Sequence, residues 1–321
     1  MIVITGAAGF IGSVIAQAIE SNDVDDIVAV DEWGADERWR NLSKRRISDF
    51  VLKDEFFAWA QKHEHDIKTI IHMGATTDTK FRNVDYLLKN NYGFTKKLWK
   101  FCAERDTRFI YASSAATYGN GAFGFSDDDD RLYDYRPLNP YGYSKLIFDR
   151  WAFEHPEQPK QHVGLRFFNV YGPNESHKGD MASVIYHGYR QIMETGAIRL
   201  FKGDGRIADG EHKRDFIYVK DIASVVMHFI DDPEISGTFN VGTGIARSFN
   251  DLARAVFSAL GRTPDIRYID MPDDLKPNYQ AFTQADISKL RSEAGYSLPF
   301  TSLEDGAADY VRNYLATGDN L

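Results

Sequence analysis

The sequence predicts an α/β protein with a doubly wound parallel sheet, because short apolar segments alternate with amphipathic segments along its first half. The expected strands are the apolar residues 2–5, 27–30, 69–72, 109–113 and 163–168. The expected helices lie between them, at residues 10–21, 85–104 and 143–154. Strands that alternate with helices in this way are typical of parallel sheets covered by helices on both faces.

A second, smaller region is expected to be interleaved with this sheet. The strand and helix pattern changes after Asn169, where a glycine-rich stretch with a charged loop begins, and it returns near residue 216. Further helices are expected near residues 249–260 and 303–314. We therefore assign residues 1–170 and about 215–246 to the main domain, and about 171–214 and 247–321 to a smaller α/β substrate-binding region.

The composition excludes several classes of protein. A formal net charge of −9 over 321 residues argues against nucleic-acid binding, which needs a basic surface to neutralise phosphates. Cys102 is the only cysteine, so an internal disulfide and a cysteine-based zinc cluster are excluded. No apolar stretch reaches about 18 residues, and a strand pattern begins at the N-terminus without a leader, so we expect a cytoplasmic protein with no membrane contact.

No metal site is expected from the distribution of histidines and acids. The nine histidines are scattered, and the closest pair, His63 and His65, lies in a charged stretch. Four consecutive aspartates at residues 127–130 favour a solvated loop over a metal site.

Three glycines indicate a nucleotide-binding turn. Gly6, Gly9 and Gly12 follow the first expected strand and open the first expected helix. Backbone without Cβ atoms can approach a pyrophosphate there, and the helix amides face its negative charge. Asp31 closes the second strand, 19 residues after Gly12, where a carboxylate can accept hydrogen bonds from the adenosine ribose. This combination predicts a Rossmann-type domain that binds a dinucleotide.

The residues alone leave the choice between NAD and NADP open. Asp31 should repel a ribose 2′-phosphate, which favours NAD. A solvated loop is the simplest interpretation of the basic residues that follow, yet they could also hold a phosphate; they are Arg38, Arg40, Lys44, Arg45, Arg46 and Lys53.

Tyr141 and Lys145 are the candidate catalytic pair, because their spacing places them on one face of a helix. A fixed ammonium and a positively charged nicotinamide both favour the phenolate, so Tyr141 could accept a hydroxyl proton while a hydride leaves. Lowering the phenol pKa by about three units corresponds to roughly 4 kcal/mol of preferential stabilisation. Ser114, at the carboxyl end of the fourth strand, is the expected partner of the reacting oxygen, with Thr117 as an alternative. Tyr143 should face away from Lys145.

These motifs, in this order, make the first 170 residues resemble the extended short-chain dehydrogenase/reductase family. A narrower resemblance, to the ADP-L-glycero-D-manno-heptose 6-epimerases, rests on SSAATYG at 113–119, RFFNVYGPNESHKGDMASV at 166–184 and QAFTQAD at 280–286. This resemblance implies that an ADP-heptose is epimerised at C6″ with a bound cofactor, usually NADP. It also implies a role in building the lipopolysaccharide inner core, and a homo-oligomer, usually a pentamer.

The resemblance implies the site residues as well, with Lys178 as a second acid/base. The implied cofactor contacts, besides the three glycines, are Phe10, Ile11, Asp31, Glu32, Arg38, Lys53, Gly74, Ala75, Thr76, Thr77, Asp78, Asn91, Tyr141, Lys145 and Val170. The implied substrate contacts are Ser114, Asn169, Gly179, Asp180, His187, Phe201, Lys202, Gly203, Asp204, Arg214 and Tyr279. Judged alone, His187, Phe201 and Tyr279 are typical of packed side chains, whereas Arg214 suits a diphosphate, which favours a bidentate cation.

Several positions depart from the pattern of this family. Asp180 takes the place of a serine, residues 207–212 lengthen the loop before Arg214, and residues 73–83 also differ. Arg38 takes the place of a lysine, which keeps the positive charge and favours NADP despite Asp31.

Other functions compete with this interpretation. A nucleotide-sugar 4,6-dehydratase needs an acid and a base beside the serine, where this chain has Ala115 and Ala116. A UDP-hexose 4-epimerase or a reductase shares the serine, tyrosine and lysine but has no need of Lys178. A non-catalytic dinucleotide sensor is disfavoured because Tyr141 and Lys145 are both present.

Overall fold

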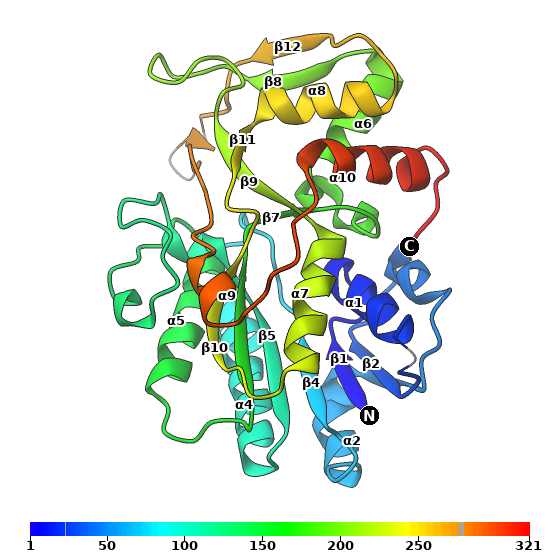
Figure 1. The fold of residues 1–321 in the computed structure, drawn as a ribbon, viewed down its shortest axis with the longest axis vertical. Helices are drawn as coiled ribbons and strands as arrows, with labels where there is room; N and C mark the ends of the chain where they lie inside the picture. The colour runs from blue at the N-terminus through cyan, green and yellow to red at the C-terminus, as the bar shows by residue number, and fades with distance from the viewer. Residues whose placement is uncertain (23, 274, 277–278) are drawn as a thin grey trace.

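A seven-stranded parallel sheet forms the centre of the protein, as the sequence predicts (Figure 1). The computed structural model describes residues 1–22, 24–273, 275–276 and 279–321. The strand order is β10-β6-β5-β4-β1-β2-β3, and each neighbouring pair is parallel. The strands are β1 (Ile2–Thr5), β2 (Ile27–Asp31), β3 (Asp49–Leu52), β4 (Thr69–His72), β5 (Arg108–Ser114), β6 (His162–Phe167) and β10 (Gly237–Val241). The direction of winding reverses between β1 and β4, so their carboxyl ends flank the crevice where such sheets bind ligands.

Helices cover both faces of this sheet, because successive side chains of a strand point to opposite faces. Ile2 and Ile4 of β1 belong to the core formed with α1 and α7, whereas Val3 between them belongs to the core formed with α2, α4 and α5. The fold class expected from the sequence is therefore confirmed. The five covering helices are α1 (Phe10–Glu20), α2 (Phe56–Lys62), α4 (Phe94–Glu104), α5 (Pro140–Glu154) and α7 (Val219–Asp231).

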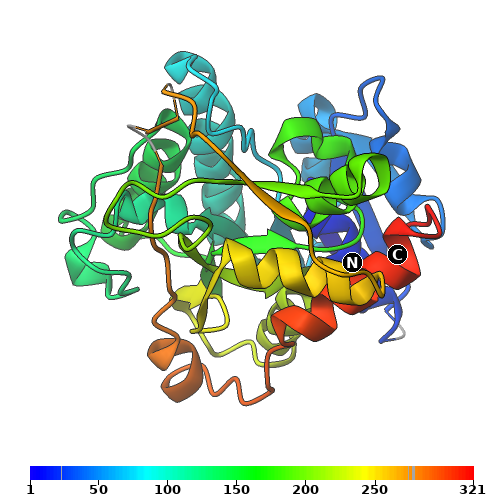
Figure 2. The ribbon, with the colours of Figure 1, turned by 90° about the horizontal axis from the view of Figure 1, so that it is seen from above.

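A smaller region lies above the carboxyl ends of the large sheet (Figures 1 and 2). It contains a three-stranded sheet, β11-β9-β7, and a two-stranded sheet, β12-β8. Its strands are β7 (Asn169–Tyr171), β8 (Ile198–Phe201), β9 (Lys213–Tyr218), β11 (Ala246–Ser248) and β12 (Ile266–Ile269). Its helices are α6 (Val184–Thr195), α8 (Phe249–Ala259) and α10 (Leu303–Tyr310), whereas α9 (Ser288–Ser292) lies beside β10 of the large sheet (Figure 1). Because β9 pairs here while α7 and β10 join the large sheet, the domain division near residues 215 and 246 remains a proposal.

Two helices differ from the sequence-based expectation in ways that matter for the site. The helix expected from residue 143 begins at Pro140, because Asn139 caps it through a 2.8 Å hydrogen bond from Gly142 N and proline suits the first helical position. Tyr141 therefore lies in the first turn of α5. The helix expected at 85–104 is divided into α3 (Val84–Leu87), a π-helical turn at Leu88–Gly93 and α4.

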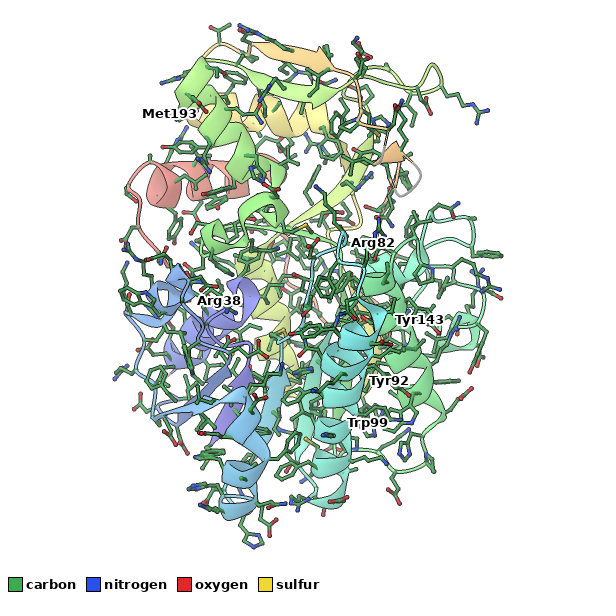
Figure 3. All side chains as sticks on the ribbon, turned by 180° about the vertical axis from the view of Figure 1, so that it is seen from behind. Arg38, Arg82, Tyr92, Trp99, Tyr143 and Met193 are labelled. Atoms are coloured by element: carbon green, nitrogen blue, oxygen red, sulfur yellow. The ribbon has the colours of Figure 1, made fainter. Side chains whose placement is uncertain are left out.

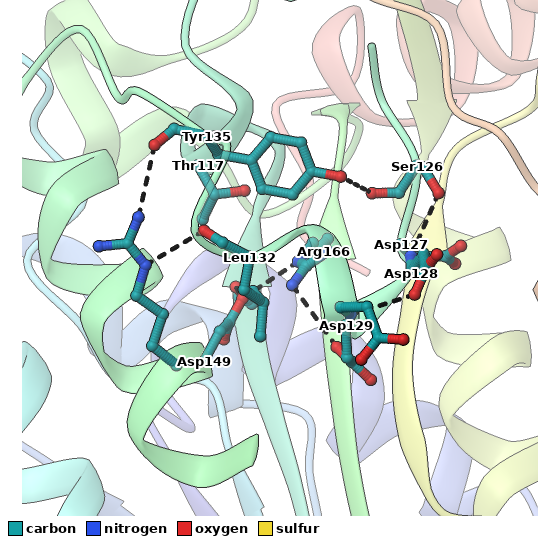
Figure 4. Close-up of polar contacts among 12 residues, drawn as sticks. Thr117, Ser126, Asp127, Asp128, Asp129, Leu132, Tyr135, Asp149 and Arg166 are labelled. Carbon is teal, nitrogen blue, oxygen red and sulfur yellow. Dashed lines mark hydrogen bonds and ion pairs between the residues drawn. The ribbon is translucent and has the colours of Figure 1, made fainter. Parts of the chain in front are cut away.

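The acidic run at residues 127–130 is only in part the solvated loop that the sequence predicts, since Asp128 and Asp130 are exposed and the other two are not (Figure 4). Asp127 is 4% exposed, and its Oδ2 accepts a hydrogen bond from a backbone amide of β10 at 2.7 Å. Asp129 lies 3.9 Å from the guanidinium of the fully buried Arg166, which also donates to Asp149 at 3.0 Å. Two of the four acids therefore belong to a buried polar network beside α5.

Within the described ranges, no helix has the length and apolar character needed to cross a bilayer. In the same part of the chain, no group of three or more histidine, cysteine, aspartate or glutamate side chains is placed to hold a metal ion.

Candidate active site

The glycine turn between β1 and α1 has a shape that suits a pyrophosphate. Gly6 has a positive φ of 70°, and a Cβ there would lie 2.5 Å from the amide nitrogen of Gly74. A Cβ at Gly12 would overlap the carbonyl oxygen of Gly6. Among the described residues, no side chain caps the start of α1, so the amides of its first turn can bind an anion. The turn therefore fits the pyrophosphate of a nicotinamide dinucleotide.

Asp31, the acid at the end of β2, is buried beside Arg38. Its Oδ2 accepts a hydrogen bond from Ala8 N at 2.9 Å, and its Oδ1 accepts one from Glu32 N at 2.8 Å. The Arg38 guanidinium, in the 3-10 helix Glu37–Leu42, lies 3.5 Å from Asp31 and donates to the Glu32 carbonyl at 2.9 Å. Burial raises the pKa of Asp31, while the Ala8 amide and the Arg38 charge oppose that rise. Asp31 and Arg38 both line a cavity of about 150 Å³.

Lys53 and Asn90 complete this cavity, whereas Asn91 lies behind it. Lys53 Nζ is hydrogen-bonded to the Asn90 side chain, and both residues line the cavity. Asn91 is 1% exposed and exchanges two hydrogen bonds of 2.9 Å with the backbone of Thr76. Asn91 therefore braces the segment after β4. Asn90, which lines the cavity, is a residue that the sequence did not indicate. That segment lines a cavity of about 440 Å³ with the glycine turn through Gly74, Ala75, Thr76, Thr77 and Asp78.

Ser114, Tyr141 and Lys145 meet in one cavity of about 320 Å³. Ser114 ends β5 and is hydrogen-bonded to the Tyr141 hydroxyl in the first turn of α5. One turn further along, Lys145 Nζ donates to the carbonyl of Ala112 at 2.8 Å. The alternative partner, Thr117, is fully buried and donates its hydroxyl to the Ser114 carbonyl at 2.8 Å. The structure therefore brings together the three residues that the sequence places at the reacting oxygen.

The protonation of this site is governed by burial. Burial raises the pKa of Tyr141, and the hydrogen bond to Ser114 opposes the rise. Burial also lowers the pKa of Lys145 to about 8, against the attraction of Asp149. The Lys145 ammonium donates to the Ala112 carbonyl at 2.8 Å, so its position near the phenol is fixed by the end of β5. Tyr143 is 45% exposed on the outer side of α5, as expected (Figure 3).

Lys178 lines the same cavity as Tyr141. It lies in the 3-10 helix Ser176–Met181, and its Nζ is 5.3 Å from the centre of the Phe10 ring. Burial lowers the pKa of Lys178, and the charge of Glu175 opposes the shift. The cavity wall thus carries two groups that can exchange a proton, on different elements of the fold.

Glu175, which the sequence did not indicate, closes the loop that carries Lys178. It is fully buried, and its Oε1 accepts hydrogen bonds from Gly172 N at 3.3 Å and from the Ser183 hydroxyl at 2.6 Å. Its Oε2 accepts one from Ser183 N at 2.6 Å. Because Gly172 precedes the loop and Ser183 follows it, one carboxylate fixes both ends. The sequence carries no signal for this role, since most glutamates are exposed.

The candidate substrate residues fall into separate groups. Asn169 and Val170 bring β7 to the 320 Å³ cavity. In the smaller region, the Arg214 guanidinium lies 5.0 Å from the centre of the Tyr279 ring, which is 6.1 Å from that of Phe201. Arg214 is 5% exposed, and burial lowers its pKa. A guanidinium that stacks on an aromatic ring and keeps free N–H groups can bind a diphosphate.

The remaining candidates lie outside the wall of the 320 Å³ cavity. Lys202 pairs with Asp270 at 3.0 Å, and Asp204 accepts hydrogen bonds from two following backbone amides. Gly203 N donates to Asp209 at 2.8 Å. The rest lie on the Lys178 loop and the helix after it: Gly179 with a positive φ of 53°, the exposed Asp180, and the half-buried His187 of α6.

Comparison with known proteins places this site in a family. Residues 2–242 match the NAD dependent epimerase/dehydratase family. The ADP-L-glycero-D-manno-heptose-6-epimerase of Nitratidesulfovibrio vulgaris is 48% identical over 322 residues, which cover 99% of each chain. This chain belongs to the ADP-L-glycero-D-manno-heptose-6-epimerase family. The ADP-L-glycero-D-manno-heptose-6-epimerase of Fusobacterium nucleatum is 46% identical and matches 100% of this chain and 99% of its own.

Solved structures agree with membership of this epimerase family. The Helicobacter pylori ADP-L-glycero-D-manno-heptose-6-epimerase superimposes with a TM-score of 0.83 at 29% identity, over 98% of this chain and 96% of its own. The UDP-glucuronic acid 4-epimerase of Bacillus cereus, solved with UDP-glucuronic acid and NAD, has a TM-score of 0.78 at 26% identity, over 97% and 99% of the two chains. Together with the glycine turn, this family membership assigns a nicotinamide dinucleotide as the cofactor.

Membership of the epimerase family also decides among the functions that the sequence left open. Ala115 and Ala116 open a 3-10 helix directly after Ser114, and neither side chain can transfer a proton. A dehydratase would need such groups there. Tyr141 and Lys145 are both in the cavity, which speaks against a non-catalytic dinucleotide sensor.

Proposed function

We propose that the protein interconverts ADP-D-glycero-D-manno-heptose and ADP-L-glycero-D-manno-heptose at C6″, using bound NADP, for synthesis of the lipopolysaccharide inner core. We further propose that it works as a cytoplasmic homo-oligomer, a pentamer by the resemblance. The observation that carries the catalytic proposal is that Tyr141 and Lys178 line one cavity with Ser114 and Lys145. During inversion by oxidation and re-reduction, the C6″ oxygen occupies two positions in the cavity, and a proton must be transferred to or from it at each one. Tyr141 can serve one position and Lys178 the other.

In this mechanism the chain supplies the proton chemistry, and the bound NADP supplies the hydride acceptor and donor. Ser114 holds the C6″ hydroxyl, and Tyr141 takes its proton as the hydride departs. The resulting ketone turns within the cavity so that its other face receives the returning hydride. Its oxygen then faces Lys178, which donates the proton that completes the inverted alcohol. Tyr141 is left protonated and Lys178 is left as the amine, so Tyr141 loses a proton to solvent and Lys178 regains one from solvent before the next turnover in this direction.

We place the ADP diphosphate at Arg214, beside Tyr279 and Phe201. A buried guanidinium without a paired carboxylate among the described residues can form two parallel hydrogen bonds to phosphate oxygens. This position sets the nucleotide in the smaller region and leaves the heptose to reach the cavity past Asn169. The roles of the more exposed candidates near Lys202 and Asp180 remain predictions.

The test of this function is an assay with each epimer of the ADP-heptose, followed by separation of the two products. We expect the purified protein to interconvert the epimers without added cofactor, because an epimerase returns its hydride to the same substrate and gains nothing by releasing the nucleotide. Denaturing the protein should release a nicotinamide nucleotide. Oxidation of the substrate without formation of the second epimer would identify a dehydrogenase instead, and protein free of nucleotide that binds none when it is added would contradict the cofactor assignment.

We propose NADP rather than NAD because Arg38 and Lys53, which line the cavity beside Asp31, can neutralise the 2′-phosphate. Replacing Arg38 with alanine should weaken NADP binding by about tenfold to a hundredfold, the loss expected for a charge-assisted hydrogen bond, and should change NAD binding little. Calorimetric titration of nucleotide-free protein measures both affinities. Arg40→Ala, an exposed residue of the same helix, is the control. Tighter binding of NAD by the unmodified protein, unchanged in Arg38→Ala, would show that Asp31 decides the cofactor.

A further inference from the structure

The loop that carries Lys178 is separate in sequence from the glycine turn, yet the reaction requires the two to keep a fixed distance. The loop contains an irregular 3-10 helix that is interrupted at Gly179 by a positive φ of 53°. Short 3-10 segments have poor hydrogen-bond geometry and define a position weakly by themselves. The Glu175 carboxylate joins the two ends of the loop, and contacts from outside the loop decide where the joined loop lies relative to the glycine turn.

Asn41 supplies such contacts from the loop after β2. Its side chain is buried, at the end of the same 3-10 helix that carries Arg38. Its Nδ2 donates to the carbonyl of Ala8 at 2.9 Å and to the carbonyl of Asn174 at 3.2 Å, and it lies 3.3 Å from Nδ1 of His177. Carbonyl oxygens only accept, so the Asn41 atom is the amide nitrogen and both of its hydrogens are used. One side chain thus joins the glycine turn to the Lys178 loop.

Asn174, the partner of Asn41 in that loop, is itself held from several directions. It has a positive φ of 72°, which is rare for a residue other than glycine and persists where the surroundings enforce it. Its Nδ2 donates to Ser13 Oγ of α1 at 3.0 Å, and its Oδ1 accepts from Leu321 N at the C-terminus at 3.0 Å. The start of the Lys178 loop is therefore fastened to α1 and to the end of the chain as well as to Asn41.

The path of contacts closes on the turn from which it starts. From Ala8 it passes through Asn41 to Asn174, and then along four residues of backbone to Lys178, whose ammonium lies 5.3 Å from the ring centre of Phe10 in the first turn of α1. The lysine is thus placed against the glycine turn by its own side chain at one end and by the Asn41 amide at the other. Neither the sequence nor the resemblance assigns Asn41 to the site.

We propose that Asn41 is a positioning residue for Lys178. By holding the carbonyls of Ala8 and Asn174 on one nitrogen, it sets the ammonium at a fixed distance from the cofactor turn. The inference rests on the acid/base role proposed for Lys178. It also makes the Arg38 helix, at the adenosine end of the cofactor site, part of the same rigid unit as the second proton-transfer group. A proton-transfer group must lie within about 3 Å of its oxygen, and a displacement of about 1 Å can lower the rate on the order of a hundredfold.

The test begins with Asn41→Leu, which has a similar size and cannot donate. We expect kcat to fall on the order of tenfold to a hundredfold, while KM and the nucleotide content stay within about twofold. The control is Ser43→Ala next to the same helix, because Ser43 is exposed and its hydroxyl donates to the Arg40 carbonyl, within the same turn, at 2.8 Å. A kcat of Asn41→Leu equal to that of the control would overturn the proposal.

A double-mutant cycle separates positioning from a general loss of structure. In the Lys178→Met background, Asn41→Leu should lower kcat by less than about twofold more, because both changes act through one group. Losses that multiply would show that Asn41 acts independently of Lys178 and that the inference is wrong. The single variant Lys178→Met reports on the proposed function separately: a kcat near that of the unmodified protein would remove the acid/base role, and with it the need for positioning.

A second variant covers the case in which Asn41→Leu does not fold. Asn41→Ser keeps one donor and leaves room for water, so the protein should melt close to the unmodified temperature and keep its nucleotide. Its kcat should lie between those of the unmodified protein and Lys178→Met, and the same cycle applies. Loss of nucleotide from Asn41→Ser with an unchanged kcat after reconstitution would assign Asn41 to cofactor binding alone and overturn its positioning role.

Discussion

Replacing Tyr141 with phenylalanine is expected to abolish epimerisation while the protein stays folded and keeps its nucleotide. The change removes one hydroxyl and leaves the ring in place at the start of α5. The cap that starts this helix comes from Asn139 and Pro140, which the substitution does not touch. Loss of a general acid/base typically lowers the rate by about a hundredfold to ten-thousandfold, so kcat should fall by that range.

The measurement is kcat with either ADP-heptose epimer, together with the melting temperature and the nucleotide released on denaturation. Tyr143→Phe is the matched control, because Tyr143 is two residues further along the same helix and 45% exposed. We expect this control to behave as the unmodified protein. If Tyr141→Phe keeps activity within a few-fold, another group is the base.

Replacing Lys178 with methionine should lower kcat by about a hundredfold or more and leave KM within a few-fold. Methionine keeps much of the length of the side chain and its contact with Phe10, but it cannot transfer a proton. Tyr141 would still oxidise the substrate at one position of the oxygen. Without a group at the second position, the ketone returns to the starting epimer instead of the inverted one.

Steady-state kinetics of Lys178→Met distinguish this role from a phosphate contact, which would mainly raise KM. Lys44→Met, a surface lysine paired with Asp319 at 2.7 Å, is the control and should leave both constants unchanged. Since burial lowers the pKa of Lys178, its ammonium donor is lost as pH rises through that lowered pKa. In the unmodified protein, kcat should therefore fall at high pH as Lys178 loses its proton. That fall should be absent in the variant. A raised KM with an unchanged kcat would contradict the two-group mechanism.

Local patterns determined the fold class and the centre of the site. The alternation of apolar strands and amphipathic helices predicted the large sheet, because each strand and each helix of such a fold has its own apolar pattern along the sequence. Gly6 and Gly12 could be assigned because a tight turn beside a pyrophosphate requires backbone without Cβ atoms. Tyr141 and Lys145 could be paired because four residues is one helical turn, and Ser114 could be added because it ends a strand on the ligand-binding edge.

Burial is what the local patterns did not predict. Asp127 was expected in a solvated loop, yet the neighbouring strand β10 covers it and hydrogen-bonds to it. Burial raises the pKa of Tyr141, and its sequence context does not indicate that shift. Both outcomes depend on how far the rest of the chain buries a side chain. A single segment of sequence does not determine that burial.

The tertiary structure alone revealed the residues that hold the site together. Asn41 and Asn174 are 133 residues apart, and Asn174 and Leu321 are 147 residues apart. The sequence around Asn41 is that of an ordinary polar loop, and Glu175 is a glutamate among polar neighbours. Sequence spacing reports which residues share a face of one element, whereas the contacts of Asn41 and Glu175 arise only when separate elements pack. The sequence by itself determined which groups can do the chemistry; packing decided which buried amides and carboxylates keep those groups at a fixed distance.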